Sequence, residues 1–192
     1  RDRLVKDICR VITRDWVKFD ENEYLLCFLN KVYDLKTSTF ISPHYSQYIS
    51  MTTGWDYING YSSKYKEHLN SVIDKIFPNK NVKQHYLTVL ATGLFGKTIQ
   101  HFFIAKGKGG NGKSMLDSLM IKTIGEYGYK LPSLAVSSAI KEGANPTIAN
   151  LHNKRFVLVQ EPDKKHKINC SSIKELTGDK WINCRTLYST LC

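Results

Sequence analysis

Residues 107–114 read Gly-Lys-Gly-Gly-Asn-Gly-Lys-Ser and satisfy the pattern G-x-x-x-x-G-K-[ST]. Glycines in such a loop let the backbone curl so that successive N–H groups point at one phosphate, and a following helix adds the positive end of its dipole. Lys113 is then expected to reach the β and γ phosphates of ATP, and Ser114 to offer a hydroxyl to Mg²⁺. The predicted ATP-binding residues are Gly107, Lys108, Gly109, Gly110, Asn111, Gly112, Lys113 and Ser114.

A loop of this kind needs a carboxylate at the end of a neighbouring strand, to hold the metal and to activate water. The apolar run 156–159 leads into Gln160 and Glu161, so Glu161 is the first acid after an expected strand. Because Gln160 carries no charge, we assign both tasks to Glu161, with Mg²⁺ held directly or through water. Lys113 and Glu161 are therefore the predicted catalytic residues. The alternative interpretation of Glu161 is an exposed acid at a strand end.

A third candidate site lies near the C-terminal end, where basic and aromatic residues alternate. Lys174, Lys180 and Arg185 are interleaved with Trp181 and Tyr188, a composition suited to gripping phosphates and stacking bases. Lys174, Lys180, Arg185 and Tyr188 are the predicted DNA-binding residues. The alternative is a capped helix, a turn and a strand with a solvated basic face.

The charge of the whole chain agrees with a polyanionic partner. The formal net charge is +11 over 192 residues; residues 1–96 hold 13 basic against 10 acidic side chains, and residues 97–192 hold 15 against 7. The excess is therefore +3 in the first half and +8 in the second. Such a balance favours nucleic acid or nucleotide as partner, although a solvated basic surface has the same composition. The five cysteines contain no C-x-x-C pair, which favours reduced thiols over a zinc site.

The pattern of apolar residues predicts the elements that position these candidates. Residues 4–12 have helical spacing, and residues 22–55 indicate small antiparallel hairpins, with a further strand at 48–52. Helices are expected at 65–77, where Pro78 ends the first, and at 82–94. After residue 97 the pattern becomes a strand at 101–105, the glycine loop, a helix beginning at Lys113 and a strand at 154–159, buried on both faces.

These elements divide the chain into three parts. Residues 1–62 are expected to form a small α+β domain, residues 63–96 a helical linker, and residues 97–192 an α/β ATPase domain with a parallel sheet. The apolar fraction of 42% is typical of a folded protein. The apolar runs are shorter than the roughly 20 residues that cross a bilayer, so no membrane partner is expected. The chain has no initiating Met and no signal-type segment, from which we expect a piece of a longer intracellular protein.

The order of these motifs resembles the superfamily 3 helicase module, with its preceding N-terminal domain, in the primase-helicases of poxviruses and other large double-stranded DNA viruses. Phage and plasmid primases are related to it. The stretches that carry the resemblance are Asn30-Lys-Val-Tyr-Asp34, Gly107–Ser114, Gly125-Glu-Tyr127, Asn145–Leu151, Lys154-Arg155-Phe156 with Glu161-Pro162, and Ile173–Asp179 with Arg185 and Tyr188. Two departures are Asn30-Lys31 in place of Asn-Gly, and a single glycine, Gly178, before Asp179.

The resemblance implies a P-loop NTPase of AAA+-like α/β fold. It further implies an ATP hydrolase and DNA helicase that forms a hexameric ring around single-stranded or forked DNA and acts with other replication proteins. The implied location is a viral replication site in the host cell, such as a cytoplasmic factory. The family carries its sensor strand and arginine finger beyond the position of Cys192, so residues 1–192 alone are expected to be incomplete at the C-terminal side, to bind Mg²⁺–ATP weakly and to form no stable ring.

Two other functions remain open at this point. A P-loop phosphotransferase acting on a small nucleotide would need an arginine-rich lid, yet only Arg155 and Arg185 occur after residue 97. A non-catalytic DNA-binding or assembly module is the second alternative. Stimulation of ATP turnover by single-stranded DNA separates both from a motor.

Overall fold

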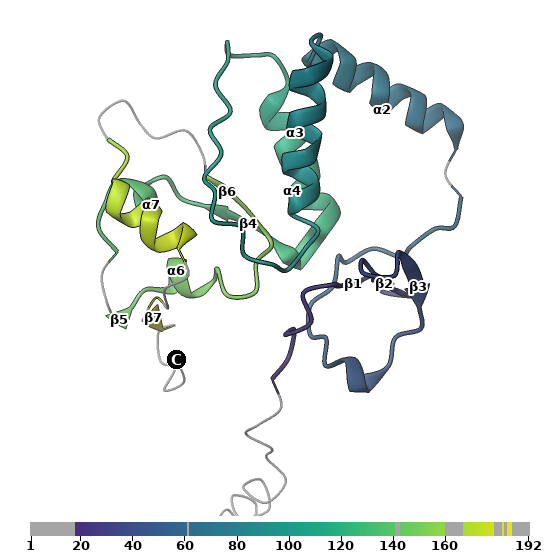
Figure 1. The fold of residues 1–192 in the computed structure, drawn as a ribbon, viewed down its shortest axis with the longest axis horizontal. Coiled ribbons are helices and arrows are strands. Elements are labelled where there is room, and N and C mark those ends of the chain that lie inside the picture. Colours follow the sequence, from purple (N-terminus) through teal and green to yellow (C-terminus); the bar gives the residue numbers. More distant parts are fainter. Residues whose placement is uncertain are drawn as a thin grey trace, which may run out of the picture.

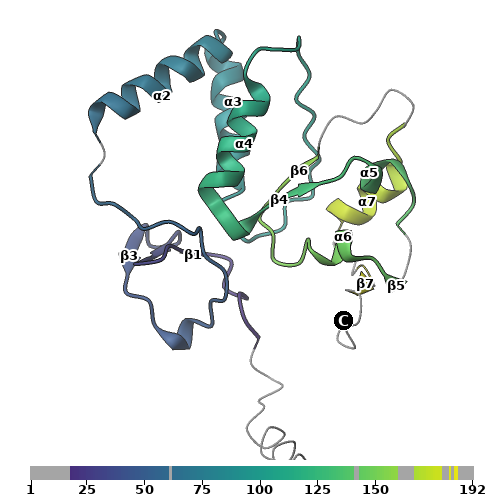
Figure 2. The ribbon, with the colours of Figure 1, turned by 180° about the vertical axis from the view of Figure 1, so that it is seen from behind.

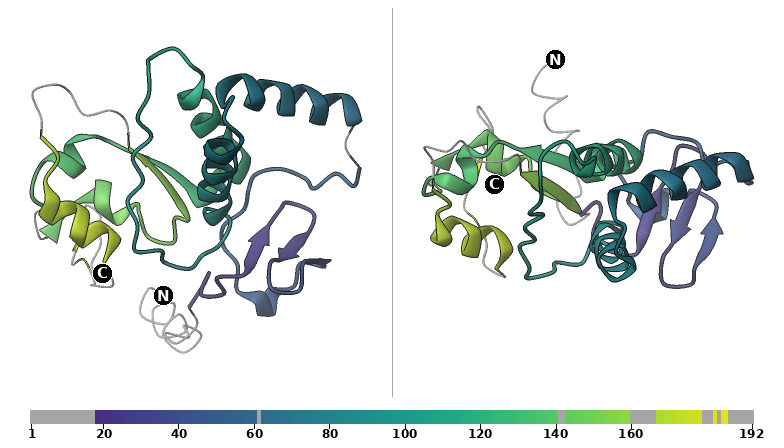
Figure 3. Two further views of the ribbon diagram at one scale, coloured as in Figure 1. Left: turned by 45° about the horizontal axis from the view of Figure 1, so that its top comes forward. Right: turned by 90° about the horizontal axis from the view of Figure 1, so that it is seen from above.

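The computed structural model describes residues 18–60, 62–140, 143–159, 167–178, 182, 184 and 185, with only the backbone of Arg185. The helix expected at residues 4–12 lies outside this part of the chain. A small sheet, β1 to β3, and helix α2 occupy one end of the molecule, helices α3 and α4 the middle, and α7 the other end (Figures 1 and 3). The view from behind shows that α2 extends away from α3 and α4 (Figure 2).

We call residues 18–60 the N-terminal module. It contains an antiparallel sheet of order β1-β2-β3, formed by Leu25–Cys27, Val32–Asp34 and Thr39–Ile41. The predicted hairpins are confirmed, and Val32 at the centre is fully buried. A one-turn helix, η1 (Tyr45–Gln47), follows.

The prediction of a strand at residues 48–52 is wrong. The carboxylate of Asp20 accepts hydrogen bonds from the backbone N–H groups of Ser50, at 2.8 Å, and Met51, at 3.4 Å. These donors are thereby taken by a side chain rather than by a neighbouring strand. Tyr48, at φ +47°, also departs from extended backbone.

The two helices of the middle region are confirmed. Helix α2 covers Ser63–Ile76, before Pro78, and α3 covers Lys80–Thr92. Asn79 begins α3, because its side-chain oxygen accepts from the N–H groups of Asn81 and Val82.

The second half contains short strands and helices around α4, which covers Lys113–Ile124 and begins where predicted. After η2 (Gly125–Tyr127), strand β4 (Gly128–Leu131) pairs in parallel with β6 (Phe156–Val159). The remaining elements are α5 (Leu134–Ser137), β5 (Gly143–Ala144), α6 (Pro146–Ala149), α7 (Cys170–Thr177) and β7 (Cys184–Arg185), which pairs in parallel with β5. Strand β6 is confirmed, whereas β4 was not expected from the sequence.

The strand predicted at residues 101–105 does not form. The backbone from Gly96 to Lys108 has no helix or strand, and Phe103 and Ile104 are 45% and 72% exposed. An apolar run becomes a parallel strand only when another strand pairs with it. Within the described residues β6 pairs with β4 alone, and Val157 of β6 is accordingly 39% exposed rather than buried as predicted. No helix among the described residues is long and apolar enough to cross a bilayer.

Candidate functional site

The glycine-rich loop 107–112 turns sharply into helix α4. Gly110 and Gly112 have φ values of +73° and +87°, a conformation that residues with a Cβ rarely adopt. A Cβ on Gly112 would also lie 2.8 Å from Cδ1 of Ile76 in α2. Gly112 is therefore required both by the turn and by the close approach of α2.

Helix α4 presents an uncapped N-terminus at the end of this loop. Gly112 begins the helix without a side-chain hydrogen bond, and there is no acidic residue in the first turn. The carbonyl of Gly112 accepts from the N–H groups of Met115 and Leu116, which leaves those of Lys113 and Ser114 outside the helical ladder. The Ser114 side chain is exposed. N–H groups, helix dipole and hydroxyl together form an arrangement suited to an anion and its metal.

The ammonium group of Lys113 folds back over the loop. Its Nζ donates to Oδ1 of Asn111 at 2.7 Å and lies 3.5 Å from the carbonyl oxygen of Lys108. A Cβ placed on Gly107 would be only 2.5 Å from the same nitrogen. The loop therefore contacts the cation through one backbone and one amide oxygen, and Gly107 supplies the space that the cation occupies.

Packing behind α4 holds the helix in place. Leu116 forms a buried cluster with Ile73 and Phe77 from the end of α2. The hydroxyl of Tyr86 in α3 donates to the carboxylate of Asp117, one turn after Lys113. Burial, followed by this hydrogen bond, raises the pKa of Tyr86 well above its usual value, so the hydroxyl remains protonated, and a donor, into the alkaline range.

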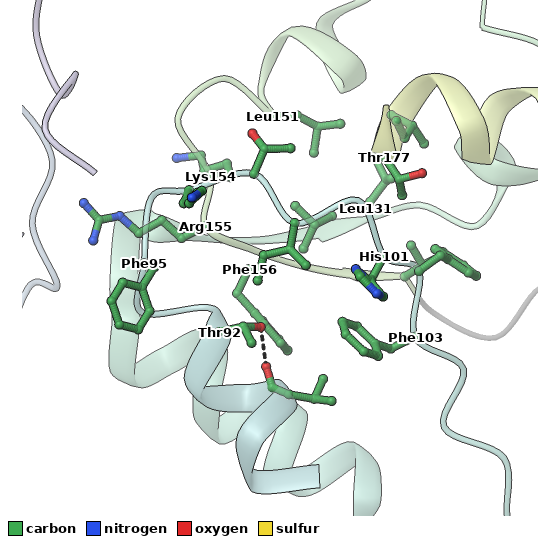
Figure 4. Close-up of a pocket in the computed structure, with 18 of the residues that line it drawn as sticks. Thr92, Phe95, His101, Phe103, Leu131, Leu151, Lys154, Arg155, Phe156 and Thr177 are labelled. Carbon is green, nitrogen blue, oxygen red and sulfur yellow. Dashed lines mark hydrogen bonds between the residues drawn. The ribbon is translucent and has the colours of Figure 1, made fainter. Parts of the chain in front are cut away.

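An apolar cavity of about 320 Å³ lies between β6 and the segment that precedes the glycine-rich loop (Figure 4). Phe156 and Leu131 from the strands face Phe103 and His101 of the segment that precedes the loop, while Arg155 lies at the opposite end from His101. No residue of the loop 107–114 lines this cavity. The cavity therefore lies between β6 and residues 98–103, which do not join the sheet.

The structure reaches only some of the other predicted site residues. Glu161, Lys180 and Tyr188 lie outside the described residues. Lys174 is exposed on α7, and Arg185 is described by its backbone alone, in β7. The structure places residues 107–114 at the start of α4. Their role in binding ATP, the grouping of Glu161 with them and the DNA-binding cluster stay predictions.

Sequence reasoning missed the residues that hold the other end of α4. Tyr127 is 1% exposed, and the half-buried Arg155 lies over its ring, with Cζ 4.4 Å from the ring centroid. The sequence offered one signal, an arginine directly before the apolar strand that begins at Phe156. A charge at such a position must find hydrogen-bond acceptors or stay in water. The distant partners of Arg155 gave no signal in the sequence.

Comparison with known proteins places the chain beside proteins of large DNA viruses. Residues 2–90 match the family described as D5 N terminal like. The chain is 32% identical over 174 residues, 88% of its length, to a candidate helicase named L207/L206 of Acanthamoeba polyphaga mimivirus. It is 30% identical over 175 residues, 85% of its length, to the protein named Primase D5 of Fowlpox virus. A candidate helicase, 121R, of Invertebrate iridescent virus 3 is 30% identical over 177 residues, 88% of this chain.

These relatives are much longer than the chain. It covers 18%, 22% and 19% of the mimivirus, fowlpox and iridescent virus proteins, respectively. The chain therefore spans about a fifth of the length of the curated relatives it matches. They are named for helicase or primase activity in large DNA viruses, and the D5-like match falls in the first half of this chain.

Proposed function

We propose that the chain is part of an ATP-dependent DNA helicase of superfamily 3 that acts in viral DNA replication. The observation that carries the proposal is the loop 107–114, which contacts the Lys113 ammonium group and leads into the uncapped N-terminus of α4. The names of the relatives support a replication role. An AAA+-like P-loop fold for residues 97–192 is part of the same proposal.

In this proposal the loop binds the phosphates of Mg²⁺–ATP. The N–H groups at the start of α4 face the β phosphate, Lys113 leaves Asn111 to contact the β and γ phosphates, and the hydroxyl of Ser114 becomes a metal ligand. Bound Mg²⁺ supplies charge that favours loss of the γ phosphate. Glu161 orients the attacking water and accepts its proton, and it contacts the metal directly or through water.

The motor acts on single-stranded or forked DNA. Lys174, Lys180 and Arg185 bind backbone phosphates, and Tyr188 stacks on a base. The parent protein forms a hexameric ring and works with other replication proteins at viral replication sites inside the host cell, including cytoplasmic factories.

Titration of the intact protein with Mg²⁺–ATP tests the loop directly. Lys113→Ala removes the cation that neutralises the phosphates, so we expect binding to be lost while the helical content stays unchanged. Lys130→Ala is the matched control, because Lys130 is an exposed lysine of β4 outside the loop. Equal binding by wild type and Lys113→Ala contradicts the proposal.

Replacement of the carboxylate separates binding from turnover. Glu161→Gln leaves the phosphate loop unchanged but, beside Gln160, removes the acid that activates water. We expect this variant to bind ATP and to retain it without hydrolysis. Normal turnover would assign the task to another acid, Asp163 or Asp179.

A further inference from the structure

Arg155 joins three separate segments of the chain. Its Nη2 donates to the carbonyl oxygen of Leu25 in β1 at 2.6 Å, and its Nη1 donates to that of Leu94, just after α3, at 2.7 Å. Its guanidinium plane lies over the ring of Tyr127. No carboxylate among the described residues forms an ion pair with it. The cation is thus held by two carbonyl groups and an aromatic face. The planar guanidinium of arginine can contact all three, whereas the single ammonium group of lysine cannot.

Tyr127, whose ring lies against the guanidinium of Arg155, also bonds to the N-terminal module. Its hydroxyl donates to the carbonyl of Met51 at 2.9 Å and accepts from the N–H of Cys27 at 3.1 Å. The ring packs with Leu26 of β1 and Ile124 of α4 in a single buried cluster. One side chain therefore satisfies two backbone groups of the N-terminal module while its ring lies at the end of α4.

The residues that precede Tyr127 also contact the N-terminal module. The backbone N–H of Thr52 donates to Oε2 of Glu126 at 2.7 Å, and the N–H of Glu126 donates to the carbonyl of Thr52 at 3.1 Å. The indole N–H of Trp55 donates to the carbonyl of Lys122 in the last turn of α4, at 2.9 Å. The bond from Trp55 satisfies one of the carbonyl groups that the C-terminal end of a helix leaves open.

Helix α4 carries Lys113 at its first residue and ends at this junction. Twelve residues of helix extend about 18 Å. A helix transmits the position of one end to the other because its backbone hydrogen bonds make it stiff. Arg155 also directly precedes β6, the strand that leads toward Glu161.

We propose that Arg155 is a positioning residue that fixes the N-terminal module to the C-terminal end of α4, and that this attachment orders the phosphate loop for nucleotide. The attachment itself is independent of the proposed function, whereas its effect on nucleotide rests on it. When the junction opens, the module and the end of α4 move separately, and nucleotide binding must then pay the entropy of ordering the loop.

Hydrogen exchange and nucleotide titration of the intact protein, on the same samples, test both parts. Arg155→Met removes the fork but keeps an apolar stem of similar length. The N–H of Gly96 donates to the carbonyl of Glu23 in the N-terminal module at 2.8 Å. We expect exchange at the N–H groups of Cys27, Thr52 and Gly96 to accelerate about tenfold or more. The affinity for Mg²⁺–ATP should fall about threefold to tenfold, with unchanged stoichiometry.

Two variants make the result specific. Lys130→Met removes an exposed cation of β4, the strand that pairs with β6, and it should leave both readouts near wild type. Arg155→Lys keeps the charge but reaches only one carbonyl, so it should not restore slow exchange. Tyr127→Phe is the milder variant if Arg155→Met fails to fold, and it should open the same amides.

The outcomes are distinct. Unchanged exchange in Arg155→Met, or equal effects in Lys130→Met, overturns the attachment. Faster exchange with wild-type affinity overturns the coupling to nucleotide. If the wild-type protein binds no nucleotide, the proposed function fails, together with the coupling, while the exchange data still decide the attachment.

Discussion

The ammonium nitrogen of Lys113 lies 2.7 Å from the carboxamide oxygen of Asn111, inside the loop that the two residues share. Both acceptors that surround this cation, Oδ1 of Asn111 and the carbonyl of Lys108, are neutral. A phosphate group offers a stronger, charge-assisted hydrogen bond in the same place. The free loop therefore holds its lysine by contacts that nucleotide can replace.

Gly107→Ala should lower nucleotide affinity with little change in fold stability. The new Cβ would lie 2.5 Å from Nζ of Lys113, so the flexible lysine must move out of the loop while the backbone stays in place. We expect a loss of about tenfold or more in affinity for Mg²⁺–ATP, measured by calorimetry. Gly109→Ala is the control, since nothing lies within 4 Å of its added Cβ. Equal affinities in the two variants contradict this account of the loop.

Gly125→Ala should destabilise the fold strongly. Its Cβ would lie 2.1 Å from the carbonyl oxygen of Thr53, a backbone atom, and its φ is +55°. Gly60→Ala has the φ penalty alone, because Gly60 has φ +88° and open space around it. In urea unfolding we expect a loss of about 1–2 kcal/mol for Gly60→Ala and about 4 kcal/mol or more for Gly125→Ala. Similar losses of stability in the two variants would show that Gly125 has no close contact with Thr53 of the N-terminal module.

Stability at alkaline pH should depend on Tyr127. Burial raises the pKa of Tyr127 to about 12, from about 10 in an unfolded chain. A raised pKa stabilises the folded state below pH 10, and that contribution is lost as the pH rises from 10 toward 12. The free energy of unfolding of wild type should therefore fall more steeply over this range than that of Tyr127→Phe. Equal slopes for wild type and Tyr127→Phe would indicate that the Tyr127 hydroxyl is exposed to water in the folded protein.

The thiol of Cys27 should react slowly. Burial, with a smaller effect from Asp20, raises the pKa of Cys27, so less thiolate is present at pH 8. Its Sγ also donates to the carbonyl of Phe28 at 3.2 Å. We expect mass spectrometry after brief alkylation to find Cys27 labelled far more slowly than the exposed Cys170. Equal labelling of both would contradict the closed junction around β1.

Neutralisation of Lys174, Lys180 and Arg185 together should weaken DNA binding uniformly across sequences. The dependence of log affinity on log salt should flatten by up to about three charges' worth of slope, because each contact releases a counterion. Basal ATP turnover should persist. An unaltered salt slope assigns these residues to a solvated face.

Local signals in the sequence located the loop and the helices. The glycines and Lys113 lie within eight residues, and Pro78 and Asn79 end α2 and begin α3, so neighbours along the chain decide these features. The expected strand at 101–105 failed because pairing depends on a partner strand, which no local pattern supplies.

The junction at the end of α4 could not be predicted from the sequence, because its partners are far apart along the chain. Arg155 finds Leu25 at a separation of 130 residues, and Tyr127 finds Cys27 at 100. Only the fold brings these groups together. Asp20, likewise, takes the N–H groups that a strand at 48–52 would have used.

The phosphate loop is proposed to drive a motor on DNA, and ATP turnover by the intact protein with and without single-stranded DNA is its sharpest test. We expect turnover to rise several-fold with DNA and to be abolished in Lys113→Ala. Turnover that DNA leaves unchanged, or that a small nucleotide acceptor raises instead, would contradict the motor and favour a phosphotransferase.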